Sequence, residues 1–186
     1  MSESYIVPVE VRSVTASHTA NLLGALAVAL SDRMADVMAA DGAITDAAAL
    51  SALHHILDRP SIDRLRQVLG LTHSGAVRLV DRLGNAGLVI RTTGQDRRTT
   101  TVTLTAAGEE LAARVTTARA AVLEAALAPL DASDRKALDR TVGTMLVGMM
   151  RGPGATRWIC RLCDTTACGR YAGACPIGRE AAYRSS

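Results

Sequence analysis

A single pair of short β-favouring segments interrupts a chain whose apolar residues otherwise follow helical spacing. Residues 88–91 and 99–105 are rich in aliphatic or β-branched side chains, and the second segment alternates in polarity. The intervening residues 92–98 are polar and include Gly94. Two such segments around a polar loop predict one β-hairpin. The sequence therefore predicts a mainly α fold that contains one two-stranded sheet.

Spacings of three and four residues between apolar side chains predict helices over most of the remaining chain. Ser61 and Thr72 are predicted N-caps, Thr45 or Asp46 caps an earlier helix, and Gly70 ends a short one. Aromatic residues make up only 2% of the chain and Phe is absent, so the core must be built from aliphatic side chains. The predicted helices cover residues 17–40, about 46–58, 62–69, 73–85, 106–129 and 132–150.

Helix, helix, short helix, turn, helix and hairpin is the element order of a winged helix-turn-helix domain. The second helix of that motif enters the major groove of DNA, with its first turn against the base edges. Arginines further along this helix suit phosphates, and arginines at a wing tip suit the minor groove. Residues 61–104 hold seven Arg against three Asp, whereas the whole chain carries only +3. The predicted DNA-binding residues are Thr72, His73, Ser74, Gly75, Arg78, Arg82, Asp96, Arg97 and Arg98.

Four stretches of this region also carry a resemblance. They are Gly-Leu-Thr-His-Ser-Gly-Ala-Val-Arg-Leu-Val-Asp-Arg-Leu at 70–83, Gly-Leu-Val at 87–89 with Arg91, Asp-Arg-Arg at 96–98, and Val-Thr-Leu-Thr-Ala-Ala-Gly at 102–108. In them the chain resembles the MarR family of transcription regulators, closely over residues 70–108 and in layout over 17–150. The resemblance implies a repressor that forms an obligate homodimer through its first and last helices. It also implies binding to a pseudo-palindromic operator in double-stranded DNA.

The resemblance assigns roles to single residues as well. Arg97 would enter the minor groove, with Asp96 orienting its guanidinium. A plainer interpretation stays open for two other arginines, since Arg82 and Arg91 can be solvated or paired with Asp81. The implied contacts of the recognition helix are His73, Ser74, Gly75 and Arg78.

The domain organisation follows from these segments. The apolar stripe on 132–150 includes Met145 and Met149 and favours core or subunit interface over a cofactor site. No segment is convincingly long and apolar enough to span a membrane, and residues 1–10 lack the features of a secretory signal, so we expect a cytoplasmic protein without a membrane partner. We predict an N-terminal extension (1–16), dimerisation helices (17–44 and 106–150), a winged helix DNA-binding domain (45–105), and a linker with a four-cysteine metal-binding tail (151–186).

The four cysteines of the chain all lie within sixteen residues of one another, as Cys160, Cys163, Cys168 and Cys175. In a cytosolic protein such clustering indicates metal ligands or redox thiols rather than disulfides. Four thiolates suit zinc or an iron–sulfur cluster. We favour the cluster because the spacing is wide and the last cysteine precedes Pro176, which is similar to ferredoxin-type ligation. Zinc and a metal-free thiol–disulfide switch are the alternatives. Arg157, Arg161 and Arg170 are expected to offset the negative charge of the thiolates.

Two functional hypotheses share the DNA-binding domain. In the first, an iron–sulfur centre senses redox state, iron or a reactive gas, and its tail packs against the dimer and sets the separation of the recognition helices. In the second, the four cysteines hold structural zinc, and a small-molecule effector binds between the dimerisation and DNA-binding helices. A thiol oxidoreductase is disfavoured, because the one Cys-x-x-Cys lies near no βαβ pattern and no acid–base arrangement accompanies it. We therefore expect a non-enzymatic protein.

Overall fold

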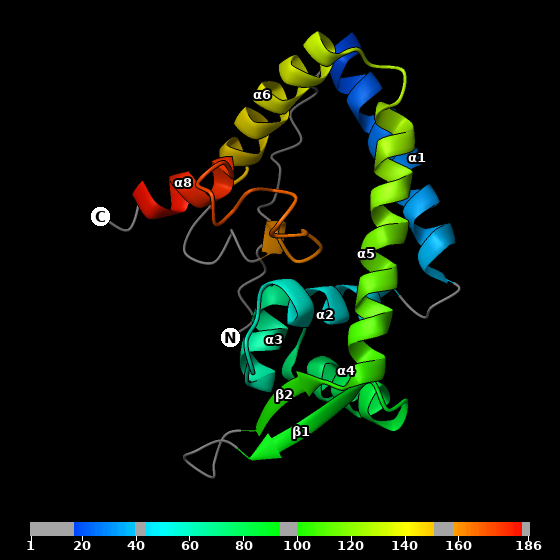
Figure 1. The fold of residues 1–186 in the computed structure, drawn as a ribbon, viewed down its shortest axis with the longest axis vertical. Helices are drawn as coiled ribbons and strands as arrows, with labels where there is room; N and C mark the ends of the chain where they lie inside the picture. Colours follow the sequence, from blue (N-terminus) through cyan, green and yellow to red (C-terminus); the bar gives the residue numbers. More distant parts are fainter. Residues whose placement is uncertain (1–16, 40–43, 94–99, 151–157, 184–186) are drawn as a thin grey trace.

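The computed structural model describes residues 17–39, 44–93, 100–150 and 158–183. Two long helices, α1 (His18–Ala39) and α5 (Ala106–Leu127), pack along each other and rise from a compact lower domain. Helix α6 (Ala132–Gly148) then folds back from the far end of α5, so that α1, α5 and α6 form an upper frame (Figure 1). No helix in the described part of the chain is long and apolar enough to cross a membrane.

The lower domain has the predicted order of a winged helix-turn-helix. It contains α2 (Ile44–His55), α3 (Ile62–Leu69) and α4 (His73–Asn85), followed by the antiparallel strands β1 (Val89–Thr93) and β2 (Thr100–Leu104). Strand β1 extends two residues beyond the predicted 88–91 and uses residues that were assigned to the loop. The prediction of a mainly α fold with one two-stranded sheet is confirmed.

Local capping explains where the helices of this domain begin and end. The Ser61 hydroxyl accepts a hydrogen bond from the backbone N–H of Arg64, which caps α3 as predicted. Gly70 closes α3 with φ of 67°, the left-handed region that glycine adopts without strain. The Thr105 hydroxyl caps α5 and also donates to the Gly87 carbonyl oxygen at 2.7 Å, which fixes the start of α5 beside the hairpin.

The prediction of a cap at Thr45 or Asp46 is wrong. Helix α2 already begins at Ile44, so Asp46 lies inside its first turn and is buried there. The same helix ends at His55, before the stop expected at Pro60. A second difference is α8 (Pro176–Tyr183), a helix that the sequence did not predict; Pro176 opens it, because proline suits the first turn of a helix.

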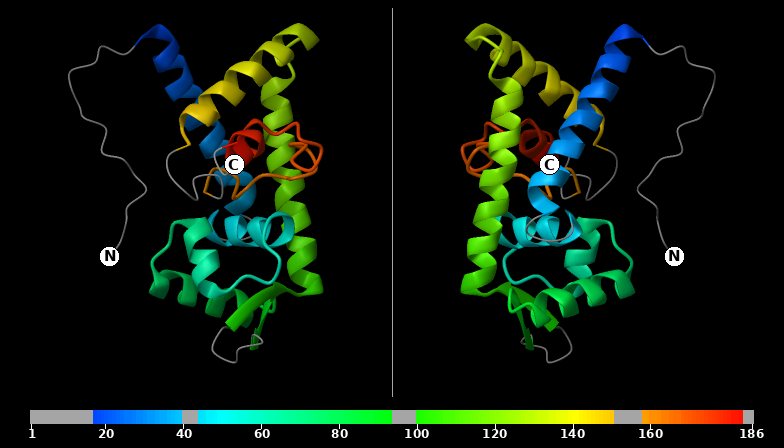
Figure 2. Two further views of the ribbon diagram at one scale, coloured as in Figure 1. Left: turned by 90° about the vertical axis from the view of Figure 1, so that its left-hand side faces the viewer. Right: turned by 90° about the vertical axis from the view of Figure 1, so that its right-hand side faces the viewer.

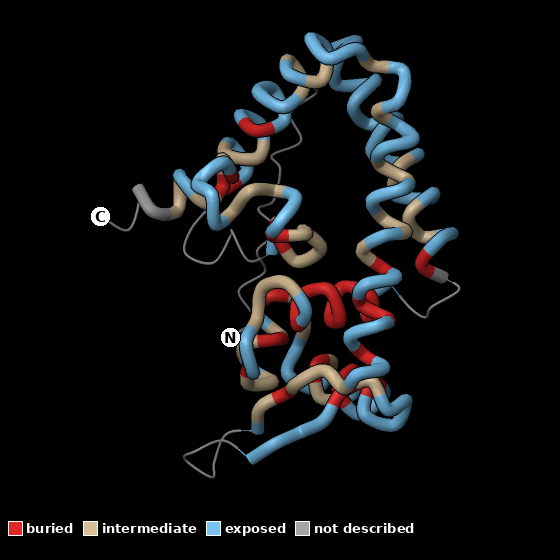
Figure 3. The backbone as a smooth tube through the Cα atoms, in the orientation of Figure 1, coloured by how far each residue is buried: buried red, intermediate tan, exposed pale blue. Residues whose placement is uncertain are grey.

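Buried side chains concentrate in the winged helix domain, with a smaller second cluster around the cysteines (Figure 3). Each large aliphatic side chain in the main core contributes about 1.5–3 kcal/mol through burial. The wing is tied to this core, since the Val102 N–H donates to the Pro60 carbonyl oxygen at 2.9 Å. The largest fully buried side chains are Leu50, Leu65, Leu79, Leu83, Val68, Val80, Val102 and Val115.

Candidate nucleic-acid interface and four-cysteine module

Helix α4 presents its first turn to solvent and buries its opposite face. Thr72 is the N-cap, and its Oγ1 accepts a hydrogen bond from the Gly75 N–H at 3.1 Å. A Cβ at Gly75 would lie 3.0 Å from that Oγ1, so glycine leaves the cap unobstructed. His73 and Ser74 follow the cap and are exposed, and Arg78 is exposed one turn further along. Polar side chains and free backbone N–H groups thus converge at the start of this helix, where they suit an anion.

Arg82 is held within the domain. Its Nε donates to Asp46 Oδ2 at 3.1 Å and its Nη2 to Asp46 Oδ1, a two-bond pair that joins α4 to α2. The hydrogen bonds that Arg82 donates to the Asp46 carboxylate raise the pKa of Arg82. Arg82 is thus paired with Asp46 and not with Asp81. Asp81 and Arg82 are consecutive residues of one helix, and such residues do not face each other. Arg91 of β1 takes that place, with its Nη2 at 2.6 Å from Asp81 Oδ1, as one of the open interpretations expected.

The predicted wing-tip residues Asp96, Arg97 and Arg98 lie outside the described residues. The two strands that lead to them are described, and they pair in register from Val89 opposite Leu104 to Thr93 opposite Thr100. The paired strands run away from the core, on the same side of the domain as α4 (Figure 1).

The cysteines gather in one cluster beneath α6. Cys160 and Cys175 are buried, whereas Cys163 and Cys168 are half-buried, and all four are free thiols. The Cys163 N–H donates to the Cys160 carbonyl oxygen at 2.8 Å, and the Gly178 N–H at the start of α8 donates to the Cys175 sulfur at 3.4 Å. Among the described residues, no group of three or more His, Cys, Asp or Glu side chains has the geometry to hold a metal ion.

Neighbouring groups make the thiols unequal. The Cys160 thiol donates a hydrogen bond to Cys163 and, with the positive charges of Arg119 and Arg170, lowers the pKa of Cys163 to about 6 against the opposing effect of burial. The same hydrogen bond and burial raise the pKa of Cys160. Burial also raises the pKa of Cys168. Within this pair the thiolate form is therefore favoured at Cys163 over Cys160.

The arginines around the thiols differ in part from the prediction. Arg170 does act on Cys160 and Cys163. Arg161 instead stacks on Trp158, with its guanidinium carbon 4.9 Å from the ring centroid. Arg157 lies outside the described residues. Arg119 of α5 was missed, because nothing in the sequence brings a residue of that helix to the tail.

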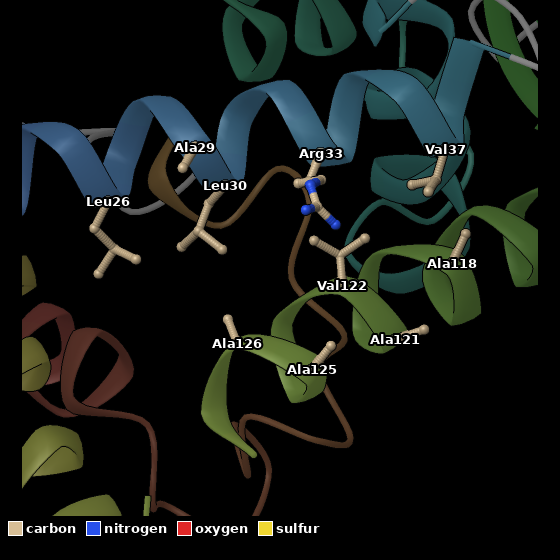
Figure 4. Close-up of a pocket in the computed structure, with 10 residues that line it drawn as sticks. All are labelled: Leu26, Ala29, Leu30, Arg33, Val37, Ala118, Ala121, Val122, Ala125 and Ala126. Carbon is tan, nitrogen blue, oxygen red and sulfur yellow. The ribbon is translucent and has the colours of Figure 1, made fainter. Parts of the chain in front are cut away.

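An apolar groove of about 590 Å³ runs between α1 and α5 (Figure 4). It lies between two of the predicted dimerisation helices and not, as expected for an effector pocket, between these and the DNA-binding helices. Among the described residues that line it, Arg33 is the one with a charged side chain. Leu26 and Val37 line it from α1 and are 50% and 38% exposed. The remaining lining residues are Ala29, Leu30, Ala118, Ala121, Val122, Ala125 and Ala126.

Comparison with known proteins identifies the domain and the fold. Residues 45–108 match a family model described as a winged helix DNA-binding domain. A MarR family protein from Bacillus stearothermophilus is 21% identical with a TM-score of 0.64, over 70% of this chain and 92% of that one. A variant of Staphylococcus aureus MepR bound to an oligodeoxyribonucleotide is 15% identical with a TM-score of 0.54, over 72% and 99%.

A third similar structure is a Mycobacterium tuberculosis MarR family protein in complex with p-aminosalicylic acid. It is 22% identical with a TM-score of 0.55, over 69% of this chain and 98% of that one. No curated protein matches the chain. The comparisons confirm the predicted resemblance in domain and in fold, and the structural matches extend over about 70% of the chain.

Proposed function

We propose that this chain, a winged helix DNA-binding protein with the fold of the MarR family regulators, is a homodimeric transcriptional repressor. The observation that carries the proposal is the exposed first turn of α4. There, polar side chains and an exposed arginine stand on the face opposite Ala76, Leu79 and Val80, which are buried. A helix with one buried apolar face and one exposed polar face can enter a major groove while its apolar face stays packed in the domain.

The recognition surface comprises Thr72, His73, Ser74, Gly75 and Arg78. His73 and Ser74 can reach base edges, and Arg78 can reach either a guanine or a phosphate. Arg82 has a different part in this proposal, since its pair with Asp46 fixes α4 on α2. Asp96, Arg97 and Arg98 complete the interface from the wing, with Arg97 in the minor groove. The MepR variant solved with an oligodeoxyribonucleotide supports this use of the fold.

The upper frame is proposed to form the dimer. Apolar side chains stand exposed along α1 and α6, among them Leu22, Val28 and Met145. Such surface is costly in water, and a second copy that covers it recovers the free energy of burial. Two-fold symmetry of the dimer would place two α4 helices on successive major grooves of a pseudo-palindromic operator.

The test of DNA binding is its dependence on salt. Affinity for duplex DNA should fall steeply as the salt concentration rises from about 50 to about 200 mM. The reason is that each phosphate that the protein neutralises releases counterions, and added salt opposes this release. Arg78→Ala should weaken binding by about tenfold, whereas the matched control Arg140→Ala, an exposed arginine of α6, should leave it unchanged. Equal losses in the two variants would contradict the proposed interface.

For the cysteines we propose an iron–sulfur cluster that senses redox state, iron or a reactive gas. Four thiols gathered in one cluster, where the positive charges of Arg119 and Arg170 lower the pKa of Cys163, are a donor set that suits such a centre. A bound cluster would supply one-electron redox chemistry. Loading requires the loop to adjust, as is usual where metal binding and folding are coupled.

Structural zinc is the second candidate, and the donor set suits it equally in chemistry. In this alternative the signal is a small-molecule effector, and the apolar groove between α1 and α5 is the candidate site for it. The Mycobacterium tuberculosis relative solved with p-aminosalicylic acid gives this alternative its support. Absorption spectroscopy and metal analysis of protein purified without oxygen separate the two. Brown protein with iron and sulfide selects the cluster, colourless protein with about one zinc per chain selects zinc, and metal-free protein refutes both.

A further inference from the structure

The segment that holds the cysteines lies between the winged helix domain and α6. We call residues 158–183 the four-cysteine module. Figures 1 and 2 show from different sides that this module occupies the space above α2 and below α6, beside α5.

The first contact caps the end of α2. Thr165 is buried, at 5% exposure, and its Oγ1 donates a hydrogen bond to the carbonyl oxygen of His55 at 3.2 Å. His55 is the last residue of α2, and a carbonyl at that position has no partner within its own helix. The module thus satisfies a backbone group of the DNA-binding domain. Ile56, the next residue, packs against the cysteine cluster itself.

The second contact reaches the turn of the helix-turn-helix. The indole of Trp158 lies against Gly70, with its Cδ1 and Nε1 3.8 and 3.9 Å from the position that a Cβ on Gly70 would take. Gly70 separates α3 from the cap of α4. Arg161 stacks on the indole from the module and donates to the Trp158 carbonyl oxygen at 2.7 Å, which orients the ring.

The third set of contacts joins the module to the upper frame. Pro176 lies against Gly143 of α6, 3.4 Å from the position of a Cβ there. Leu146 and Val147 of α6 pack on the cluster that contains Cys160 and Cys175. The thiols therefore lie on the path between the frame and the turn that precedes the recognition helix.

We propose that the module is an intramolecular link through which the state of the four thiols sets the DNA affinity of α4, with Trp158 as the positioning residue at the α3–α4 turn. While the four thiols are held together, the module stays packed. The indole of Trp158 then remains on Gly70, and Thr165 remains hydrogen-bonded to the end of α2. Loss of that arrangement withdraws both contacts, and the turn then gains freedom that DNA binding must remove. This inference rests on the proposed function.

The experiment compares two states of the thiols without assuming what they hold. The dissociation constant for duplex DNA is measured for the wild-type chain and for a variant with all four cysteines replaced by Ser, and their ratio is the coupling. We expect a ratio of at least about fivefold, the lower end of typical allosteric coupling. In the Trp158→Ala background the ratio should fall below about twofold by the same scale. In the Tyr171→Ala background it should keep its wild-type value, because Tyr171 is an aromatic residue of the same module that is 82% exposed.

Hydrogen exchange gives a readout that does not need DNA. In the four-Ser variant, amides of α3 and of the turn at residues 70–72 should exchange faster than in the wild type, while those of α5 should not change. A second variant, Thr165→Val, removes the cap with little change in shape and should speed exchange at the end of α2. A coupling ratio near one in the wild type, an unchanged ratio in Trp158→Ala, or unchanged exchange at the turn would each overturn the inference. Wild-type protein that binds no duplex would refute the proposed function instead, and the exchange rates would still decide the link.

Discussion

Replacing Arg82 by Ala should destabilise the protein more than replacing Asp46, the residue with which it pairs. The Asp46 side chain is only 13% exposed, whereas that of Arg82 is 53% exposed. Arg82→Ala therefore leaves a buried carboxylate without its two hydrogen bonds, while Asp46→Ala leaves a guanidinium that water can solvate. An unsatisfied buried polar group costs about 1–3 kcal/mol, and the partial exposure of this pair argues for the middle of that range. We expect Arg82→Ala to lower the free energy of unfolding by about 2 kcal/mol and the Tm by about 4–8 °C.

Urea denaturation followed by circular dichroism measures this difference. Asp46→Ala should cost less than about 1 kcal/mol. The matched control is Arg91→Ala, which breaks the exposed ion pair with Asp81 and should cost about 0–1 kcal/mol. If Arg82→Ala cost no more than Arg91→Ala, the assignment of Arg82 to holding α4 on α2 would be refuted, and Arg82 would return to the group of free DNA contacts.

Three further predictions concern single positions in the winged helix domain. Gly108→Ala should cost about 3 kcal/mol or prevent folding, because its Cβ would lie 2.0 Å from the Leu88 carbonyl oxygen; Gly148→Ala, with nothing within 4 Å, is the control in the same urea assay and should be tolerated. Thr72→Ala should cost about 1 kcal/mol through loss of the α4 cap, and Ser at this position should restore most of it. Burial, followed by the charge of His54, lowers the pKa of His55 below 6.5, so protonation favours the unfolded chain. The contribution of His55 to stability should be complete above about pH 6.5 and fall as the pH drops through the folded-state pKa, and His55→Gln should remove that part of the pH dependence.

Local signals were sufficient to predict most of the winged helix. A hydroxyl before a helix and a glycine after it act within four residues, so Ser61, Thr72 and Gly70 could be assigned from the sequence and are confirmed. The alternation of residues 99–105 likewise placed β2. Asp46 shows the limit of this reasoning, since its role depends on Arg82, which is 36 residues away in the chain. Only the folded domain, in which both helices contact α3, brings the two together.

The structure of the four-cysteine module could be predicted only in part, because residues that suit a metal centre also serve as packing residues of the fold. The Cys175-Pro176 pair is similar to a ferredoxin-type ligation motif, yet in the fold Pro176 opens α8 and packs on Gly143. The sequence predicts that Arg161 offsets the charge of the thiolates, but in the fold its guanidinium stacks on the Trp158 ring. Arg119 gave no signal, since a residue of a long helix acquires a role at the cysteines only when the tail folds against it. The prediction of a four-thiol centre itself stays a proposal.

The most direct test of the central claim is selection of DNA by the protein from a pool of duplexes with random sequence. After several rounds at physiological salt, a homodimer that reads DNA through two α4 helices should enrich one inverted repeat. Its half-sites should lie about one helical turn apart, roughly 10 base pairs from centre to centre. The Arg78→Ala variant should enrich the same repeat weakly or not at all. Sequencing that finds no enriched motif with the wild-type chain, or a motif without two-fold symmetry, would contradict the account of a dimeric DNA-binding regulator.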